Sequence, residues 1–318
     1  MSESTRITNF PISFFAMVMG LCGLTIATQK LEGLLSVGDM ASTVLLGITL
    51  FVLVALTVAY AVKAVRHWDL CAAEFNDPVR LSFFPTFSIS LLLVSIAFLP
   101  ISDTVSFVLW IIGTALHLVL TLAVLSIWVQ HEKFEITHMN PAWFIPVVGN
   151  ILVPLAGIDH APAEISWFFF SVGLVFWIVL QTLFFYRVFF HRPLPERLLP
   201  TFFILLAPPA VGFIAYVKLT GVVDSFANVL YYFAVFTFLF LLVQLRTLRK
   251  ARFFLSWWAY SFPLAALTIA SILMYHQTDT RFFYYLTFVV FAALAAVIVT
   301  LVLFTARSVK RRQICVED

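Results

Sequence analysis

The polar side chains that could act on a ligand inside the hydrophobic segments of this chain are uncharged donors. Hydroxyl and amide groups recur in alternate segments, and no lysine or arginine lies deep within those segments. A pathway built from such groups would select its ligand by hydrogen-bond donors, backbone dipoles and diameter rather than by fixed charge. Any one serine or threonine can instead bond to its own helix, so only the whole set indicates a pathway. The candidate lining residues are Ser13, Thr86, Ser88, Asn150 and Ser261.

One aromatic side chain differs from the many other phenylalanines. Phe262 precedes Pro263 in the middle of a hydrophobic segment, where a disturbed backbone can turn the ring toward the axis of a helix bundle. An apolar ring at that place closes a narrow pore by its size and by excluding water. The same ring could equally fill the space between helices, and its position alone does not separate the two interpretations.

Groups suited to enzyme or metal chemistry are sparse. His117 is the one ionisable side chain near the middle of a segment, and a proton relay would need a carboxylate or a second histidine that its segment lacks. A histidine bonded to a neighbouring helix is the simpler interpretation. The three cysteines show no C-x-x-C spacing, and the segments hold no His, Asp or Glu cluster with metal-ligand spacing. We therefore expect no enzyme activity, no metal and no cofactor.

Composition places these segments in a membrane. The 318 residues are 62% hydrophobic and 11% charged, with a mean hydropathy of +1.03, whereas about a quarter of a soluble domain is charged. Ten apolar stretches each approach the roughly 20 residues that span a bilayer, and their hydrophobicity does not alternate as in a barrel. We expect an all-α integral membrane protein with one domain over residues 1–318, surrounded by membrane lipid and without a nucleic-acid partner. The stretches are 11–28, 41–66, 81–99, 104–130, 141–157, 163–191, 198–218, 225–245, 254–276 and 281–306.

Prolines divide the ten stretches into two kinds. They fall inside the third, fifth, seventh and ninth stretches and inside none of the even-numbered ones. Because a proline removes a helix hydrogen bond, it persists in lipid only where protein groups or a watery cavity satisfy the freed carbonyl. We expect the odd-numbered helices to form a kinked inner layer, supported from outside by the even-numbered helices. The predicted kinks are at Pro85, Pro146, Pro208, Pro209 and Pro263, with Pro154 also inside the fifth stretch.

The same prolines indicate a repeat. Pro85, Pro146, Pro208 and Pro263 are 61, 62 and 55 residues apart, about the length of a two-helix hairpin with its loops. Five hairpins that run in the same direction would arrange five inner helices around an axis along the membrane normal, with a central pore. Kinked helices that only pack a core are the alternative.

Basic residues predict the orientation. With ten spans, 16 of the 19 lysines and arginines fall on the side of the N-terminus and 3 on the other side. Cytoplasmic loops carry the excess of these residues, so both termini are predicted to be cytoplasmic. A miscount of one span would remove this bias, which supports an even number of spans.

Four runs, in order along the chain, resemble one family of membrane proteins. The run Trp-Trp-Ala-Tyr-Ser-Phe-Pro at 257–263 resembles the ninth helix of the plant guard-cell slow anion channels and of their bacterial relatives, the tellurite-resistance/dicarboxylate transporter family. The others are Asp-Pro-Val-Arg at 77–80 with Phe-Phe-Pro at 83–85, Pro-Val-Val-Gly-Asn at 146–150 and Leu-Ala-Pro-Pro-Ala at 206–210. The resemblance covers all ten stretches.

The resemblance implies five hairpins in a quasi-five-fold ring around an anion pore, and homotrimers with one pore in each subunit, in a bacterial inner membrane. It implies that Phe262 closes the pore and that Phe15 is a pore-side aromatic. Two positions depart from the pattern of the bacterial relatives, because Ala16 stands in place of a glycine and Val18 in place of a proline. The geometry of that part of the pore wall is therefore open.

These observations together predict an anion channel that passes small monovalent anions, such as chloride or nitrate, down their gradients. The alternative is a secondary transporter or exporter of a C4-dicarboxylate, sulfite or a tellurite-like oxyanion, since the family contains such members. A transporter usually has an ionisable coupling site and inverted repeats, and the sequence shows neither.

Overall fold

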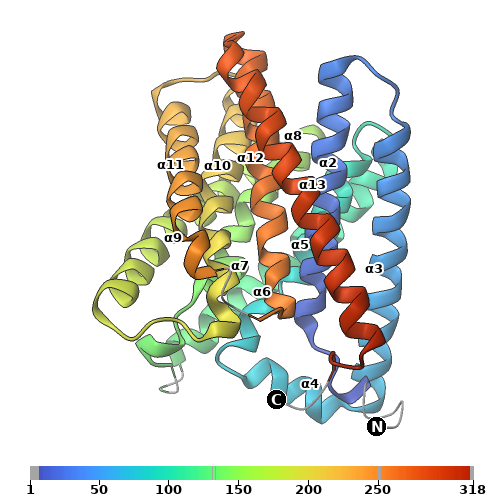
Figure 1. The fold of residues 1–318 in the computed structure, drawn as a ribbon, viewed down its shortest axis with the longest axis vertical. Coiled ribbons are helices and arrows are strands. Elements are labelled where there is room, and N and C mark those ends of the chain that lie inside the picture. Colours follow the sequence, from blue (N-terminus) through green and yellow to red (C-terminus); the bar gives the residue numbers. More distant parts are fainter. Residues whose placement is uncertain (1–6, 131, 133, 249–251, 316–318) are drawn as a thin grey trace.

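Ten helical spans cross the long dimension of the protein. The computed structural model describes residues 7–130, 132, 134–248 and 252–315, and all regular structure within those residues is helical. Ten helices in this part of the chain are long and apolar enough to span a membrane, which confirms the number predicted from hydropathy. They lie side by side along the long axis of the bundle, joined by short connections (Figure 1).

The five even-numbered spans are unbroken α-helices on the outside of the bundle. Their apolar windows are 17–39% buried, against 72–89% for the odd-numbered spans, so the predicted inner and outer layers are confirmed. These five helices contain no proline, and their backbone hydrogen bonds continue without interruption. They are α3 (Met40–Arg66), which follows one edge of the bundle in Figure 1, α6 (Asp103–Gln130), α9 (Ala163–Phe190), α11 (Ser225–Leu248) and α13 (Arg281–Lys310).

The five odd-numbered spans are segmented. Each begins with a 3₁₀ segment and ends as an α-helix, and the short helices α4 (Trp68–Asn76) and η3 (Ile136–His138) lie in connections between spans. In chain order the spans are η1 (Ile12–Phe14) with α2 (Phe15–Leu35); η2 (Arg80–Phe83) with α5 (Thr86–Phe98); η4 (Pro141–Trp143), α7 (Phe144–Val148), η5 (Gly149–Leu152) and α8 (Pro154–His160); η6 (Glu196–Leu206) with α10 (Ala207–Thr220); and η7 (Leu255–Tyr260) with α12 (Ser261–Thr278).

Most of the prolines singled out in the sequence lie where a span changes to α-helix. An N–H group in the first turn of an α-helix has no acceptor within that helix, so a proline there removes no helical hydrogen bond. Its fixed φ angle also suits the first turn. The residues at these junctions are Pro85, directly before α5, and Pro154, Pro208, Pro209 and Pro263 in the first turns of α8, α10 and α12.

Pro146 is the third residue of the five-residue helix α7, so it also lies in a first turn, and the α-helix ends two residues later at Val148. The Thr121 hydroxyl of the outer helix α6 donates to the Pro146 carbonyl at 2.6 Å, and the Asn150 amide donates to the Val147 carbonyl at 2.8 Å. Side chains thus bind the carbonyls of the interrupted helix at a depth where lipid offers no partner.

The five inner spans, one from each hairpin, form a closed ring. Helix α2 packs against α5, α5 against α8, α8 against α10, α10 against α12, and α12 returns to α2. Each outer helix packs against the inner span that precedes it in the chain. The expected quasi-five-fold arrangement of hairpins is therefore present, and the axis of the ring runs between helices whose prolines and small residues shape their inner faces.

Glycines in α2 allow a close contact between α2 and α12. A methyl group on Gly23 would lie 2.8 Å from the Ala265 Cβ and 3.4 Å from Phe262 Cδ2, and a methyl group on Gly20 would overlap the Ser261 side chain. The absence of a side chain at these two positions lets α12 approach α2 closely. This approach places the ring of Phe262 against α2.

Candidate functional site

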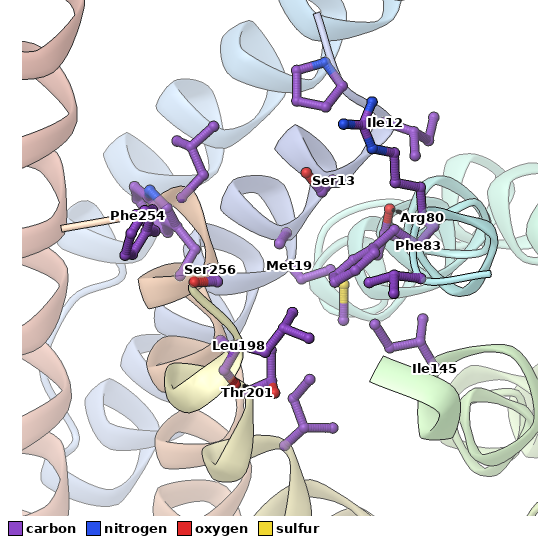
Figure 2. Close-up of a pocket in the computed structure, with 18 of the residues that line it drawn as sticks. Ile12, Ser13, Met19, Arg80, Phe83, Ile145, Leu198, Thr201, Phe254 and Ser256 are labelled. Atoms are coloured by element: carbon purple, nitrogen blue, oxygen red, sulfur yellow. Dashed lines mark hydrogen bonds between the residues drawn. The ribbon is translucent and has the colours of Figure 1, made fainter. Parts of the chain in front are cut away.

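A large cavity opens at the end of the bundle where the described chain begins and ends. It has a volume of about 1280 Å³, and we call it the lower cavity. All five inner spans contribute to its wall, and Figure 2 shows Ser13, Met19, Phe83 and Ile145 around one space although they come from three different spans. Other wall residues from the spans are Ala16, Thr86, Ile89, Val148, Thr201, Pro208 and Trp258.

A second cavity lies at the opposite end of the bundle. This upper cavity has a volume of about 1000 Å³ and is lined by α2, α5, α8, α10 and α12 of the inner ring and by the connection from α2 to α3. Apolar residues such as Ile26, Leu93, Ile214 and Ile269 form much of its wall. The two cavities together follow the axis of the ring from both ends.

Three apolar residues separate the two cavities. Phe262, Leu152 and Val211 each line both the lower and the upper cavity. They come from the ninth, fifth and seventh spans, and Leu152 and Val211 are 4% and 5% exposed. A constriction made only of apolar side chains resists wetting as well as blocking ions by size. We call these three residues the constriction.

The two cavities differ in charge. Four basic residues line the lower cavity and two acidic ones accompany them, whereas the upper cavity has two lysines and four carboxylates. The lower mouth is therefore basic and the upper mouth acidic. The lower set is Lys63, Arg80, Arg197 and Arg252 with Glu74 and Asp77, and the upper set is Lys30 and Lys218 with Glu32, Asp39, Asp103 and Asp159.

A buried ion pair fixes the start of the first span at the lower mouth. The Lys63 ammonium donates to Glu74 Oε2 at 2.7 Å, and the side chains are 4% and 3% exposed. Glu74 Oε1 accepts the backbone N–H of Ile12 at 2.8 Å, and Lys63 donates to the Phe10 carbonyl at 2.9 Å. Because the pair is desolvated, its hydrogen bonds must all be present to offset the cost of burial. It therefore holds α4, α3 and the first turn of the first span together.

Three of the residues predicted from the sequence line the cavities. Ser13 and Thr86 line the lower cavity, and Phe262 lines both cavities. In the first span the partly exposed positions Ser13, Ala16 and Met19 lie three residues apart and line the same wall. This spacing is one face of a helix.

The other predicted lining residues point elsewhere, and none of them belongs to the described walls of either cavity. Phe15 is 1% exposed and packs edge to face on Phe87 with ring centres 5.0 Å apart. Ser261 donates to the Trp258 carbonyl at 2.6 Å, and Ser88 and Asn150 bond within the protein as described below. One residue along an α-helix turns the side chain by about 100°, so Ala16 rather than Phe15 reaches the cavity.

Polar groups between the third, fourth and fifth spans form a buried network. The Ser88 hydroxyl lies 2.9 Å from His117 Nδ1, which confirms the interpretation of His117 as a histidine bonded to a neighbouring helix. The Asn150 amide donates to Thr121 Oγ1 at 3.1 Å. The His117 ring packs so closely on Gly149 that a methyl group there would lie 2.7 Å from His117 Cε1. This network fastens the interrupted fifth span to the outer helix α6.

The described part of the chain holds few side chains suited to enzyme or metal chemistry. Among the described residues, no three His, Cys, Asp or Glu side chains meet in a group that could hold a metal ion. Much of the cavity wall is formed by apolar residues that the sequence did not predict as lining residues. They include Leu152, Val211, Met19 and Ile89. Their types carry no signal, because every face of a buried membrane helix is apolar.

Known proteins with similar sequences are named as anion channels, as uncharacterised transporters or as a tellurite resistance protein. The family model described as voltage-dependent anion channel matches residues 9–306. The chain is 30% identical over 274 residues to the S-type anion channel SLAH2 of Arabidopsis thaliana, covering 84% of this chain and 53% of the plant protein. It is 26% identical to an uncharacterised transporter of Methanocaldococcus jannaschii, covering 86% of each, and 27% identical to a tellurite resistance protein TehA homolog of Haemophilus influenzae, covering 86% of this chain and 83% of that protein. The chain spans about half the length of the plant channels SLAH2 and SLAH3.

Proposed function

This chain belongs to the voltage-dependent anion channel family, and we propose that it conducts small monovalent anions, such as chloride and nitrate, through a pore closed at Phe262. The family consists of anion channels and transporters rather than enzymes, so the role of the protein is anion transport across a membrane. One observation carries the proposal. Two cavities follow the axis of the inner ring and meet at three apolar side chains.

The segmented inner spans can select anions although no lysine or arginine lies deep within them. Helices α5, α8, α10 and α12 begin partway along their spans, beside the lower cavity or the constriction. The N-terminus of a helix carries a partial positive charge of about half a unit, and such half-helix ends stabilise anions at mid-membrane in transport proteins. Hydroxyl groups of Ser13, Thr86 and Thr201 add neutral hydrogen-bond donors along the lower wall.

The constriction accounts for a resting closed state. Phe262 leans on α2 beside Gly23 while Leu152 and Val211 face it from two other spans. The ring is the largest of the three side chains and lies in the first turn of α12, just after the 3₁₀ segment η7. A change in that first turn would move the Phe262 side chain away from the axis while the five inner helices stay packed against one another.

We place the protein in a bacterial inner membrane with both termini in the cytoplasm, so that the lower cavity faces the cytoplasm. The Lys and Arg excess on the side of the termini supports this orientation. Homotrimers with one pore in each subunit are part of the proposal and rest on the family resemblance. The outer helices expose apolar faces such as that of α3, which contact lipid or a neighbouring subunit.

Anion-substitution currents in a reconstituted bilayer test the proposal. We expect unitary current steps whose reversal potential follows the chloride gradient and persists when nitrate replaces chloride. Sulfite and a C4-dicarboxylate, the substrates expected of a secondary transporter, are tested in the same bilayer. Saturable flux of such an oxyanion, coupled stoichiometrically to protons and without unitary steps, would contradict the channel proposal.

A further inference from the structure

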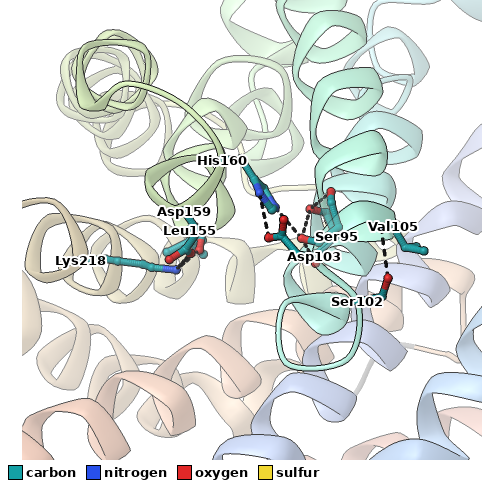
Figure 3. A network of polar contacts seen from close by, with 9 residues as sticks. Ser95, Ser102, Asp103, Val105, Leu155, Asp159, His160 and Lys218 are labelled. Atoms are coloured by element: carbon teal, nitrogen blue, oxygen red, sulfur yellow. Dashed lines mark hydrogen bonds and ion pairs between the residues drawn. The ribbon is translucent and has the colours of Figure 1, made fainter.

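The two lysines of the upper cavity differ in whether their charge is compensated. Lys218 of α10 donates to the Leu155 carbonyl at 2.6 Å and pairs with Asp159, both in α8, as Figure 3 shows. This ion pair adds no net charge to the cavity. Lys30 of α2 lines the same cavity and is exposed, and within the described part of the chain its ammonium group makes no hydrogen bond or ion pair.

Lys30 lies on the face of α2 that follows the axis of the inner ring. Met19 lines the lower cavity, and Gly23, Ile26 and Lys30 line the upper one. Spacings of four, three and four residues keep these positions on one face of the helix. Gly23 lies beside Phe262, and seven residues at 1.5 Å each place Lys30 about 10 Å above that level. Lys30 is therefore just above the constriction.

Three of the four carboxylates in the described wall of the upper cavity are held by other groups. Glu32 accepts two backbone N–H groups at the start of α3, Asp159 pairs with the lysine of α10, and Asp103 contacts a histidine of α8. Asp39, the fourth, directly precedes α3 and makes no ion pair with Lys30. A mobile anion from solution can therefore act as the counter-ion of Lys30.

The rest of the upper cavity repels anions. Its four carboxylates outnumber its two lysines in the described wall, so an anion on the axis crosses an unfavourable field there. A fixed cation beside the path lowers this barrier locally. An ammonium group on a flexible stem suits the task, because it is strongly hydrated and conduction needs binding weak enough to release the ion.

From this arrangement we infer that Lys30 is an anion-binding residue of the upper cavity, which holds a small monovalent anion just above the constriction. The inference deepens the proposed function and rests on it, since it assigns the place where a conducted ion pauses. Lys30 is the one uncompensated lysine or arginine in the described wall of this cavity, so the site balances a single negative charge. A dicarboxylate would need a second uncompensated cation.

The first test is the anion current of Lys30→Gln at two salt concentrations. A unit charge about 5 Å from an anion changes its local concentration about four-fold even at the dielectric constant of water. The Debye length is about 30 Å at about 10 mM salt and about 3 Å at about 1 M. Lys30→Gln should therefore pass about a quarter of the unaltered current at the low concentration and nearly all of it at the high one.

Arg281→Gln is the matched control for the loss of one charge. Arg281 is exposed at the start of α13, at the same end of the bundle, but it does not belong to the described wall of the upper cavity. Its replacement should leave the current close to that of the unaltered protein at both salt concentrations. Equal losses of current in the two variants would overturn the inference.

Lys30→Cys allows the charge to be removed and then restored. A positively charged methanethiosulfonate reagent in the upper solution should return the current of this variant to that of the unaltered protein, and a negatively charged reagent should lower it further. The native thiols do not interfere, since Cys22 and Cys71 are buried and Cys315 lines the lower cavity. A current that ignores the charge of the reagent would contradict the assignment of Lys30.

A binding measurement separates this inference from the proposed function. Nitrate bound at Lys30 stabilises the folded protein by mass action, so replacing gluconate by nitrate at constant ionic strength should raise the melting temperature. The rise should be smaller in Lys30→Gln than in Arg281→Gln, even if the protein passes no anions. Equal rises would overturn the inference, whereas unequal rises without any current would support the site and contradict only the channel proposal.

Discussion

The contact between α2 and α12 gives a prediction whose size follows from the structure. Gly23→Ala adds a methyl group 2.8 Å from the Ala265 Cβ, which is 0.6 Å short of the 3.4 Å at which ordinary contact begins. Neither carbon can rotate away, because each is attached directly to its backbone. The two helices must therefore separate by several tenths of an ångström, and overpacking of this kind costs about 1–3 kcal/mol. Phe262 lies beside the contact, so its ring moves and the resting anion current should rise.

The assay is thermal unfolding of purified protein together with the resting current. Gly47→Ala is the matched control, since a methyl group on Gly47 in the outer helix α3 has no heavy atom within 4 Å. That substitution should be neutral or should stabilise the helix by up to about 1 kcal/mol. If Gly23→Ala unfolds at the same temperature as the control and conducts no more than the unaltered protein, the close packing inferred for α2 and α12 is wrong.

Two further predictions concern buried polar contacts. Glu74→Gln leaves the Lys63 ammonium buried without its counter-ion, so we expect a loss of about 3–5 kcal/mol in the free energy of unfolding; a double variant with Met at both positions should recover most of it, and a single variant as stable as the double one would contradict the pairing. Thr121→Val removes the hydroxyl bound to the Pro146 carbonyl and should cost about 1–3 kcal/mol in thermal or chemical unfolding. The exposed hydroxyl of Thr182 bonds only within α9, so Thr182→Val should change stability by less than about 0.5 kcal/mol, and equal losses at the two positions would refute the role of Thr121.

Composition and proline positions were sufficient to predict the architecture. Continuous hydrophobicity fixes the number of spans because a bilayer sets their length. Prolines mark four of the five inner spans, because they lie where a segmented span changes to α-helix. In the interrupted fifth span, the Thr121 hydroxyl of the outer helix α6 donates to the Pro146 carbonyl. The placement of the prolines at the start of α-helices was not evident, because a sequence does not show where a 3₁₀ segment ends.

The lining of the cavities was only partly predictable. A buried membrane helix is apolar on every face, so its sequence does not show which face meets the axis. Ser88 and Asn150 were predicted from their polarity, and they instead bond to His117 and Thr121 between spans. Leu152 and Val211, which separate the cavities together with Phe262, are apolar residues without any distinguishing neighbour in the sequence.

The anion current of Phe262→Ala tests the central claim most directly. If the Phe262 ring closes the constriction, its removal should give a folded protein with a large resting anion current, and Phe262→Leu should lie between it and the unaltered protein because leucine is smaller yet still apolar. Phe213→Ala is the packing control, since Phe213 is fully buried against Tyr231, and its loss should cost about 3–5 kcal/mol without opening the pore. A Phe262→Ala protein that keeps its oligomer size and melting temperature while its current does not rise would contradict a pore closed at Phe262.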